Sequence, residues 1–257
     1  MTLGRCLALP LCDLELVLAV DISRSMDLDE QRLQRDGYVA ALRHPEVVAA
    51  IGSGPAGRIA VTYVEWAGPF HQAVLVPWTV VSSRAEAEAF SDRVAAAPMV
   101  RERGTSISEG LAFAASLFPA TGARGARRAI DVSGDGPNNM GPAVVPVRDR
   151  VVSEGITING LPIMLKPAFS YGPYNIPDLD LYYEDCVIGG PGAFMISVDD
   201  MSRFAVAVRR KLVLEIAGRM PEPRVLRAAV FEAPPRVDCL IGEKQRSRWL
   251  YEDPSLK

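Results

Sequence analysis

Short apolar blocks recur along the chain, and their lengths are typical of strands. LELVLAV at 14–20 is apolar except at Glu15, which indicates a parallel strand buried on both faces. Two further blocks, RIAVTYVEW and AVLVPWTVV, are separated by a turn around Gly68 and Pro69, which predicts an antiparallel hairpin. The predicted strands cover residues 14–20, 58–66, 73–81, 128–133, 156–163 and 194–198.

Longer stretches between these blocks carry helix signals. Pro45 suits the first turn of a helix, and His44 before it is disfavoured in helical conformation. Ser83 can cap a helix whose first turn is rich in acidic residues. The predicted helices cover residues 29–43, 45–51, 83–97, 108–118, 142–154 and 200–217.

This alternation of strands and helices predicts an α/β fold. We expect a doubly wound, mostly parallel sheet flanked by helices, with one antiparallel edge strand from the hairpin. Ligands of such sheets bind at the carboxyl ends of the strands. We expect a leader or remnant of a signal segment at 1–11, a domain at 12–218 and a C-terminal tail at 219–257, with an irregular insertion at 166–185.

Composition excludes several classes of protein. Hydrophobic residues make up 49% of the 257 residues and charged residues 23%, which is ordinary for a globular chain. The net charge of −3 gives no electrostatic reason to expect nucleic acid as a partner. No apolar run approaches the roughly 20 residues of a transmembrane helix. The cysteines form no CxxC pair and lie far in sequence from both histidines, which argues against a zinc site.

Oxygen-rich loops follow or precede the predicted elements at three places. Asp21, Ser23 and Ser25 come directly after the first predicted strand, Thr105 lies just before a helix, and Asp135 follows the strand at 128–133. All three loops belong to the carboxyl edge of the predicted sheet. Hard oxygen ligands without His or Cys suit magnesium, manganese or calcium. The sequence therefore predicts a divalent-metal site at this edge.

The same five residues carry a family resemblance. DxSxS at Asp21, Ser23 and Ser25, followed by Thr105 and by Asp135 in SGDG, resembles the metal-ion-dependent adhesion site of von Willebrand factor type A domains. The chain from 12 to 217 is similar to one bacterial branch, the domain of unknown function 1194 family of mostly exported proteins. The stretches that carry this similarity are LVLAVDISRSMD, DVSGDGPNN and VIGGPGAF.

The resemblance implies a role for each residue. The hydroxyls of Ser23, Ser25 and Thr105 would bind the metal directly, and Asp21 and Asp135 would hold it largely through water and through those hydroxyls. A magnesium ion bound mainly by neutral oxygens keeps much of its charge and an open position, which an acidic side chain of a partner protein can fill.

Each residue also has a simpler interpretation. Ser25 could cap the helix that follows it, Thr105 could cap the helix at 108–118, and Asp135 could be a turn residue. Each simple interpretation is adequate for one residue alone. The order and spacing of all five favour the metal site.

These patterns predict a non-enzymatic, metal-dependent protein-binding module outside the cytoplasm, periplasmic or secreted. Two alternatives stay open: a metal-assisted hydrolase, and a subunit that works with a separate ATPase or chelatase. The first alternative needs a general base or nucleophile beside the metal. The chain contains no P-loop, so any ATPase would be another protein. Four reduced thiols in a cytoplasmic protein are the alternative for the compartment.

A disulfide between Cys12 and Cys186 is the expected covalent link. Cys12 precedes the first strand and Cys186 precedes the predicted strand at 194–198. If both strands are parallel, both cysteines lie at the end of the sheet opposite the metal site. Cys6 would then belong to the leader and Cys239 would remain unpaired.

Overall fold

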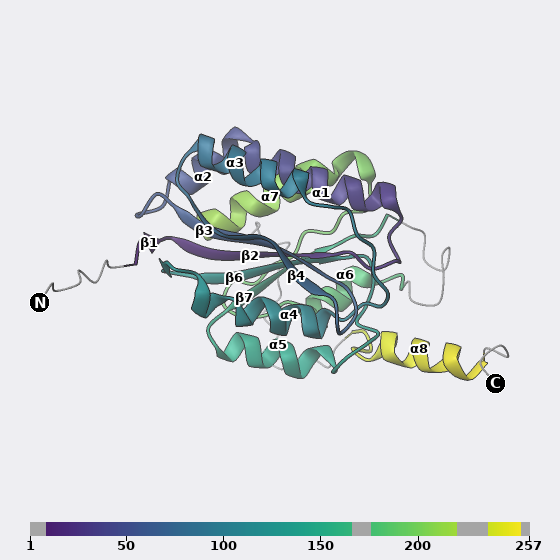
Figure 1. Ribbon diagram of the computed structural model, residues 1–257. Helices are drawn as coiled ribbons and strands as arrows, with labels where there is room; N and C mark the ends of the chain where they lie inside the picture. Colours follow the sequence, from purple (N-terminus) through teal and green to yellow (C-terminus); the bar gives the residue numbers. More distant parts are fainter. Residues whose placement is uncertain (1–8, 166–175, 220–235, 253–257) are drawn as a thin grey trace, which may run out of the picture.

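A five-stranded sheet forms the middle of the molecule in the computed structural model, which describes residues 9–165, 176–219 and 236–252 (Figure 1). The strand order is β4-β3-β2-β6-β7, and every neighbouring pair is parallel except β3 and β4. The predicted doubly wound, mostly parallel sheet with an antiparallel edge strand is confirmed. The strands are β2 (Leu14–Asp21), β3 (Ile59–Trp66), β4 (Gln72–Val81), β6 (Arg128–Gly134) and β7 (Thr157–Pro162).

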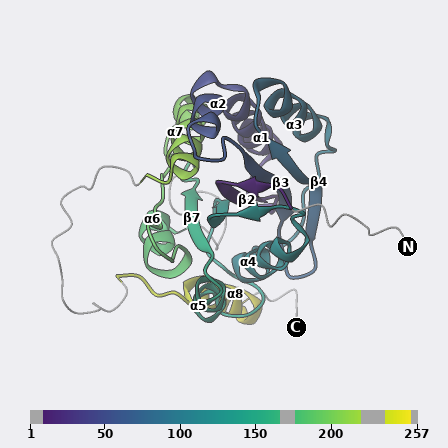
Figure 2. The same ribbon diagram turned by 90° about the vertical axis from the view of Figure 1, so that its left-hand side faces the viewer.

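Helices cover both faces of the sheet (Figure 2). Along β2, Leu16 and Leu18 join the apolar cluster of one face, and Val17 and Ala19 join that of the other. This double burial explains why the first strand is apolar at successive positions. One face carries α1 (Leu28–Arg43), α2 (Pro45–Gly52), α3 (Arg84–Ala96) and α7 (Phe204–Ala217); the other carries α4 (Ile107–Ser116), α5 (Val144–Ser153) and α6 (Leu179–Tyr182).

Shorter elements complete the described fold. Two-residue strands β1 (Leu11–Cys12) and β5 (Arg124–Gly125) pair in parallel beside the start of β2. Phe118–Ala120 and Met201–Arg203 form single 3₁₀ turns. Within the described ranges, none of the helices combines the length and the apolar character that crossing a bilayer requires.

The strand predicted at 194–198 does not form. Only isolated bridges join this segment to β7 and to the residue after it, between Gly160 and Met195 and between Ile163 and Val198. The hydrogen bonds explain the interruption. The Gly160 amide donates to Phe194 and the Pro162 carbonyl accepts from Val198, but Pro162 has no N–H for the bond between them. The segment therefore follows the edge of the sheet without a continuous ladder.

Residues predicted to be irregular contain helices. The insertion at 166–185 includes α6 and the start of a π-helix, Tyr183–Val187, while its first part, 166–175, lies outside the described residues. The tail expected from 219 onward contains α8 (Ile241–Glu252). Its weak apolar periodicity hid this helix, because much of α8 is exposed.

The predicted disulfide was wrong. The structure joins Cys186 to Cys239, with their Cα atoms 5.6 Å apart, and leaves Cys12 as a buried free cysteine. Cys12 packs with Ala60 and Ala123 near the start of β2, and burial raises the pKa of its thiol. Cys186 lies in the π-helix, in the apolar cluster on the face of the sheet that carries α4 and α5. The prediction failed because it depended on a strand at 194–198 and on a tail without contacts to the domain.

A buried ionic cluster fixes α7 to the sheet. The Lys211 Nζ lies 2.5 Å from an Asp131 carboxylate oxygen on β6 and 2.9 Å from the Glu215 carboxylate one turn along α7. All three side chains are at most 3% exposed. Asn159 on β7 donates to the same Glu215 oxygen at 2.7 Å. The pKa of Asp131 is raised to about 7: burial is the largest cause, the Glu215 carboxylate adds to the shift and Lys211 opposes it.

This pKa has a consequence for stability. Because the folded pKa lies above that of an unfolded aspartate, the folded protein holds a proton that the unfolded chain releases above about pH 4. The contribution of Asp131 to the free energy of unfolding is therefore greatest at low pH and declines as the pH rises to 7. Tyr38, which also faces this carboxyl, stays protonated throughout this range because burial raises its pKa further.

We predict that the stability difference between the wild type and Asp131→Asn falls by about 1–3 kcal/mol between pH 5 and pH 8, since the amide cannot ionise. Urea unfolding of both proteins with a metal chelator present measures this difference at each pH. A difference that stays constant across the range would contradict the assignment.

Candidate metal centre

The three predicted loops meet at the carboxyl edge of the sheet. β2 and β6 are neighbours, and Val20 pairs with Ser133, so both strands end at the same level. Asp21 is the last residue of β2, and Asp135 follows the last residue of β6. The α1 and α4 helices start from the adjoining loops. The topology thus delivers the loops that the sequence analysis singled out to one place.

Four of the five predicted residues form one chain of hydrogen bonds. Asp21 Oδ1 accepts from the Ser23 amide at 2.7 Å. The Ser23 and Ser25 hydroxyl oxygens are 2.7 Å apart, and the Ser25 hydroxyl donates to Asp135 Oδ1 at 2.5 Å. Asp21 and Ser23 are at most 1% exposed, whereas Ser25 is exposed and Asp135 partly so. The cluster therefore runs from the interior to the surface.

Thr105, the fifth predicted residue, is bonded through its backbone to Asn139 rather than to the other four. Its amide donates to Asn139 Oδ1 at 3.0 Å, and its carbonyl accepts from the Asn139 amide at 2.9 Å. A second link runs to the first loop, because Glu102 exchanges backbone hydrogen bonds with Ile22 and Arg24. Thr105 is 3% exposed. The second loop is thus held between the other two, and Asn139 is a supporting residue that the sequence analysis missed.

Neighbouring residues perform the capping roles that could have explained Ser25 and Thr105. Asp27 accepts from the amides of Asp29 and Glu30 at the start of α1. Ser106 is the N-cap of α4. The Ser25 hydroxyl instead donates to Asp135. The simpler interpretations of Ser25 and Thr105 as helix caps are therefore wrong.

The electrostatics of the cluster suit a cation. Burial raises the pKa of Asp21 well above its usual range, and the nearby Asp135 carboxylate raises it further. Asp21 Oδ2 is buried and has no hydrogen-bond partner. The buried Tyr183 hydroxyl also has none, and burial raises its pKa, with further increases from Asp21 and Asp135. A buried carboxylate oxygen without a partner is costly, and a bound cation would remove that cost.

The donor set fits a hard divalent ion. Carboxylates and hydroxyls supply oxygen only, the ligand type of magnesium, manganese and calcium. Among the described residues, no three His, Cys, Asp or Glu side chains are grouped so as to hold a metal. Any ion at this centre would therefore depend on the hydroxyls of Ser23, Ser25 and Thr105 as well as on Asp21 and Asp135.

Comparisons with known proteins place the fold. The family model for proteins of unknown function DUF1194 matches residues 11–220. A von Willebrand factor type A structure from Catenulispora acidiphila is 15% identical, with a TM-score of 0.53, over 80% of this chain and 43% of that chain. No curated protein matches the chain.

Two further solved structures are similar over 80% of this chain. Proximal thread matrix protein 1 from the mussel byssus, with a zinc-occupied MIDAS motif, is 13% identical with a TM-score of 0.56 over 46% of that chain. The pilus adhesin SpaC from Lactobacillus rhamnosus GG, in its open conformation, is 14% identical with a TM-score of 0.58 over 30% of that chain. The chain thus spans less than half the length of these structures. At these identities the similarity shows the von Willebrand factor type A fold alone.

Gly134 offers a test of how tightly the centre is built. A Cβ at this position would lie 2.9 Å from Asp21 Oδ2 and 3.0 Å from the Tyr183 hydroxyl. We expect Gly134→Ala to lower the free energy of unfolding of the metal-free protein by about 1–3 kcal/mol, because one of these buried groups must move. Chemical denaturation with a chelator present measures the change.

Gly52→Ala is the matched control. Gly52 is the last residue of α2, and a Cβ there meets nothing within 4 Å. We expect this substitution to be neutral or to stabilise by up to about 1 kcal/mol. Equal stabilities for Gly134→Ala and the wild type would show that the space between Asp21 and Tyr183 is looser than the geometry indicates.

Proposed function

The chain belongs to the DUF1194 family of proteins of unknown function, and we propose that it is a protein-binding module whose partner is held through a divalent metal ion. One observation carries this proposal. The hydroxyls of Ser23 and Ser25 link the Asp21 side of the cluster to Asp135, while one buried oxygen of Asp21 keeps no hydrogen-bond partner.

The residues of the centre would divide the work of holding the ion. Ser23, Ser25 and Thr105 would offer neutral hydroxyl oxygens, and Asp21 and Asp135 would supply the negative charge. A magnesium ion held in this way supplies an open coordination position and most of its positive charge. The exposure of Ser25 supports a site that a partner can reach from solvent.

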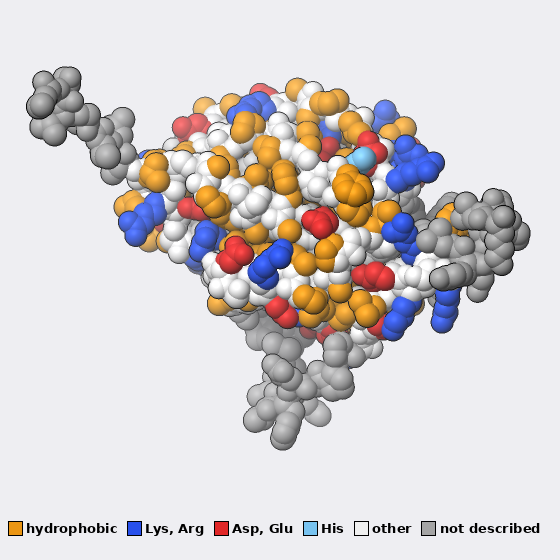
Figure 3. Space-filling view, turned by 60° about the horizontal axis from the view of Figure 1, so that its bottom comes forward, with side chains coloured by type: hydrophobic (Ala, Val, Ile, Leu, Met, Phe, Trp, Pro, Cys, Tyr) orange, Lys and Arg blue, Asp and Glu red, His pale blue; other side chains and the backbone are white. Residues whose placement is uncertain are grey.

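The surface gives little reason to expect recognition by charge alone. On the face shown in Figure 3, acidic side chains are scattered among apolar ones, and basic side chains are scattered too, with several along the right-hand edge of the view. The net charge of the chain is −3. A metal ion at the centre would be a concentrated positive charge, and an acidic side chain of a partner protein would complete its coordination.

The proposed compartment is outside the cytoplasm, periplasmic or secreted. The disulfide between Cys186 and Cys239 supports this location, because such bonds persist in oxidising compartments and are rare in the cytosol. The bond closes a separation of 53 residues. Loss of a bond that closes a loop of this length is expected to destabilise a chain by a few kcal/mol in the chain-entropy account.

Metal binding is tested by thermal unfolding. A ligand that binds only the folded state stabilises it by about 2.7 kcal/mol at 100 times its Kd, so magnesium, manganese or calcium should raise the Tm of the wild type. Asp21→Ala and Ser23→Ala should abolish the rise. Asp29→Ala is the matched control, because Asp29 is an exposed acid at the start of α1 that pairs with Arg32.

Two results would count against the metal centre. No rise in the Tm of the wild type with any of the three ions would remove metal dependence from the proposal. A rise in Asp21→Ala and Ser23→Ala as large as that of the wild type would place the ion elsewhere in the molecule.

The alternative of a metal-assisted hydrolase has one structural argument. The His71 ring lies 3.2 Å from the Glu102 carboxylate, and Glu102 is bonded through its backbone to the first metal loop. A histidine oriented by a carboxylate is a possible general base. The His71 side chain is 40% exposed and the Glu102 side chain 34% exposed, which favours a surface ion pair over a catalytic pair.

We expect the protein with magnesium or manganese to hydrolyse neither phosphate nor carboxyl esters above the rate in buffer. Hydrolysis is followed with chromogenic esters of both classes. Turnover that is lost in both Asp135→Ala and His71→Ala would replace the binding module with an enzyme.

A further inference from the structure

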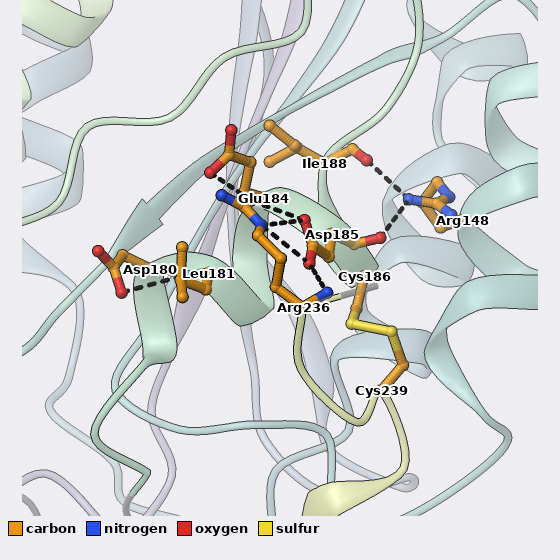
Figure 4. Close-up of polar contacts among 9 residues, drawn as sticks. All are labelled: Arg148, Asp180, Leu181, Glu184, Asp185, Cys186, Ile188, Arg236 and Cys239. Carbon is orange, nitrogen blue, oxygen red and sulfur yellow. Dashed lines mark hydrogen bonds and ion pairs between the residues drawn. A yellow bond between two sulfur atoms is a disulfide. The ribbon is translucent and has the colours of Figure 1, made fainter. Parts of the chain in front are cut away.

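The segment at 236–252 is fastened to the domain at its start. The Arg236 guanidinium lies 2.7 Å from carboxylate oxygens of both Glu184 and Asp185. The backbone amide of Arg236 donates to the Asp185 carboxylate at 2.6 Å. Three residues later, Cys239 is joined to the fully buried Cys186 (Figure 4). Glu184, Asp185 and Cys186 all belong to the π-helix, so the start of the segment cannot leave the domain while the disulfide is intact.

The anchor is itself held to the helix layer. Arg148 on α5 donates to the Ile188 carbonyl at 2.9 Å and to the Asp185 carbonyl at 3.5 Å (Figure 4). Tyr182 and Cys186 are fully buried in the apolar cluster on this face. The attachment point of the segment is therefore a rigid part of the core.

From this anchor, α8 reaches the third metal loop. Figure 1 shows α8 at the end of the sheet where β2 leads into α1, the end at which the metal loops lie. Glu243 Oε1 accepts from Asn138 Nδ2 at 2.7 Å, and Arg246 donates to the Asn139 carbonyl at 3.4 Å. A Cβ on Gly242 would lie 2.2 Å from the Asn138 carbonyl oxygen, so the helix backbone lies directly on the loop.

Asn138 and Asn139 transmit this contact to the second metal loop. Asn138 is fully buried; its Oδ1 accepts from the Ser108 amide at 3.1 Å while its Nδ2 donates to Glu243. Asn139 Oδ1 accepts from the Thr105 amide at 3.0 Å. The Asn138 side chain therefore connects the start of α4 with α8, whereas Asn139 bonds to Thr105 through its side chain and to Arg246 of α8 through its backbone carbonyl.

Glu243 has the features of a group retained for this contact. It is partly buried, its Oε2 has no hydrogen-bond partner, and burial raises its pKa. An unsatisfied buried oxygen costs stability, and the bond from Asn138 to the other carboxylate oxygen offsets part of that cost. A helix of α8's length is also marginal by itself in water, which makes its attachment through Cys239 necessary.

Resting on the metal centre proposed above, we infer that Asn138, Asn139 and Glu243 are positioning residues for that centre, and that the Cys186–Cys239 disulfide keeps α8 against the metal loop. The bracing helix lies beyond residues 11–220, which the family model matches. The loops that carry Thr105 and Asp135 would be preformed by it before any ion binds.

Amide hydrogen exchange of the metal-free protein tests the brace without reference to metal. The Thr105 and Ser108 amides donate to the two asparagine side chains, so their exchange reports on the loop directly. We expect Glu243→Ala and Cys239→Ser each to raise the exchange rates of these two amides several-fold. Glu243→Gln should keep the exchange rates of the wild type, because the carbonyl oxygen of the glutamine side chain can accept from Asn138. Arg248→Ala, at an exposed position of α8, is the matched control.

Metal affinity is the second measurement, by calorimetric titration with magnesium and with manganese. Supporting residues of metal sites are worth about 10–100-fold in affinity, and we expect about tenfold weaker binding in Glu243→Ala and Cys239→Ser. Unchanged exchange in both variants, or an unchanged Kd in both, overturns the inference while leaving the metal centre standing. If the wild type binds neither ion but exchange still responds, the proposed function fails and the brace stands as a structural device.

Discussion

The pairing register of β2 with β6 is the constraint on which the candidate centre depends. Val20 lies opposite Ser133, so the two strands end together, and the chain places a carboxylate at or just beyond the end of each. The hydroxyls of Ser23 and Ser25, two residues apart in the first loop, lie between the two carboxylates.

Two of the buried acidic groups, Asp131 and Asp21, differ in the charges that surround them. At Asp131, α7 provides a cation of its own in Lys211, and the charge is balanced within the fold. At Asp21 the neighbouring charge is a second carboxylate, Asp135, and no cationic side chain of the described residues offsets the charge of Asp21. The ion pair at Asp131 holds α7 against the sheet, whereas the negative charge at Asp21 and Asp135 could be balanced by a bound cation. Burial raises the pKa of both groups, so the shift alone does not distinguish a structural pair from a binding site; the partners do.

The sequence predicted the fold and the loops of the centre because those signals are local. A fully apolar strand, a capped helix and a DxSxS turn each lie within a few residues, and sheet topology alone then brings Asp21 and Asp135 together. What it could not predict depends on distant partners. Asn138 becomes a supporting residue only when α8 lies on it, and Cys239 finds Cys186 across 53 residues. The strand at 194–198 fails because of Pro162 on the neighbouring strand, a residue whose missing N–H matters only once the two segments are paired.

Lys211 also fixes where α7 can sit along the sheet. A slide of one helical turn would move its ammonium group by about 5.4 Å, away from Asp131 and into the apolar cluster of that face. Glu215 lies on α7 and would move with Lys211, but the slide would leave the buried Asp131 carboxyl without its cation, which disfavours a second register of this helix. The close packing of α1 on α7 also restricts the position of α7, since a Cβ on Gly37 would lie 2.6 Å from the Phe204 ring. These contacts disfavour axial movement of α7 along the sheet. If the centre binds a partner as proposed, the structural effect of binding would therefore be local to the edge of the sheet where the three loops meet.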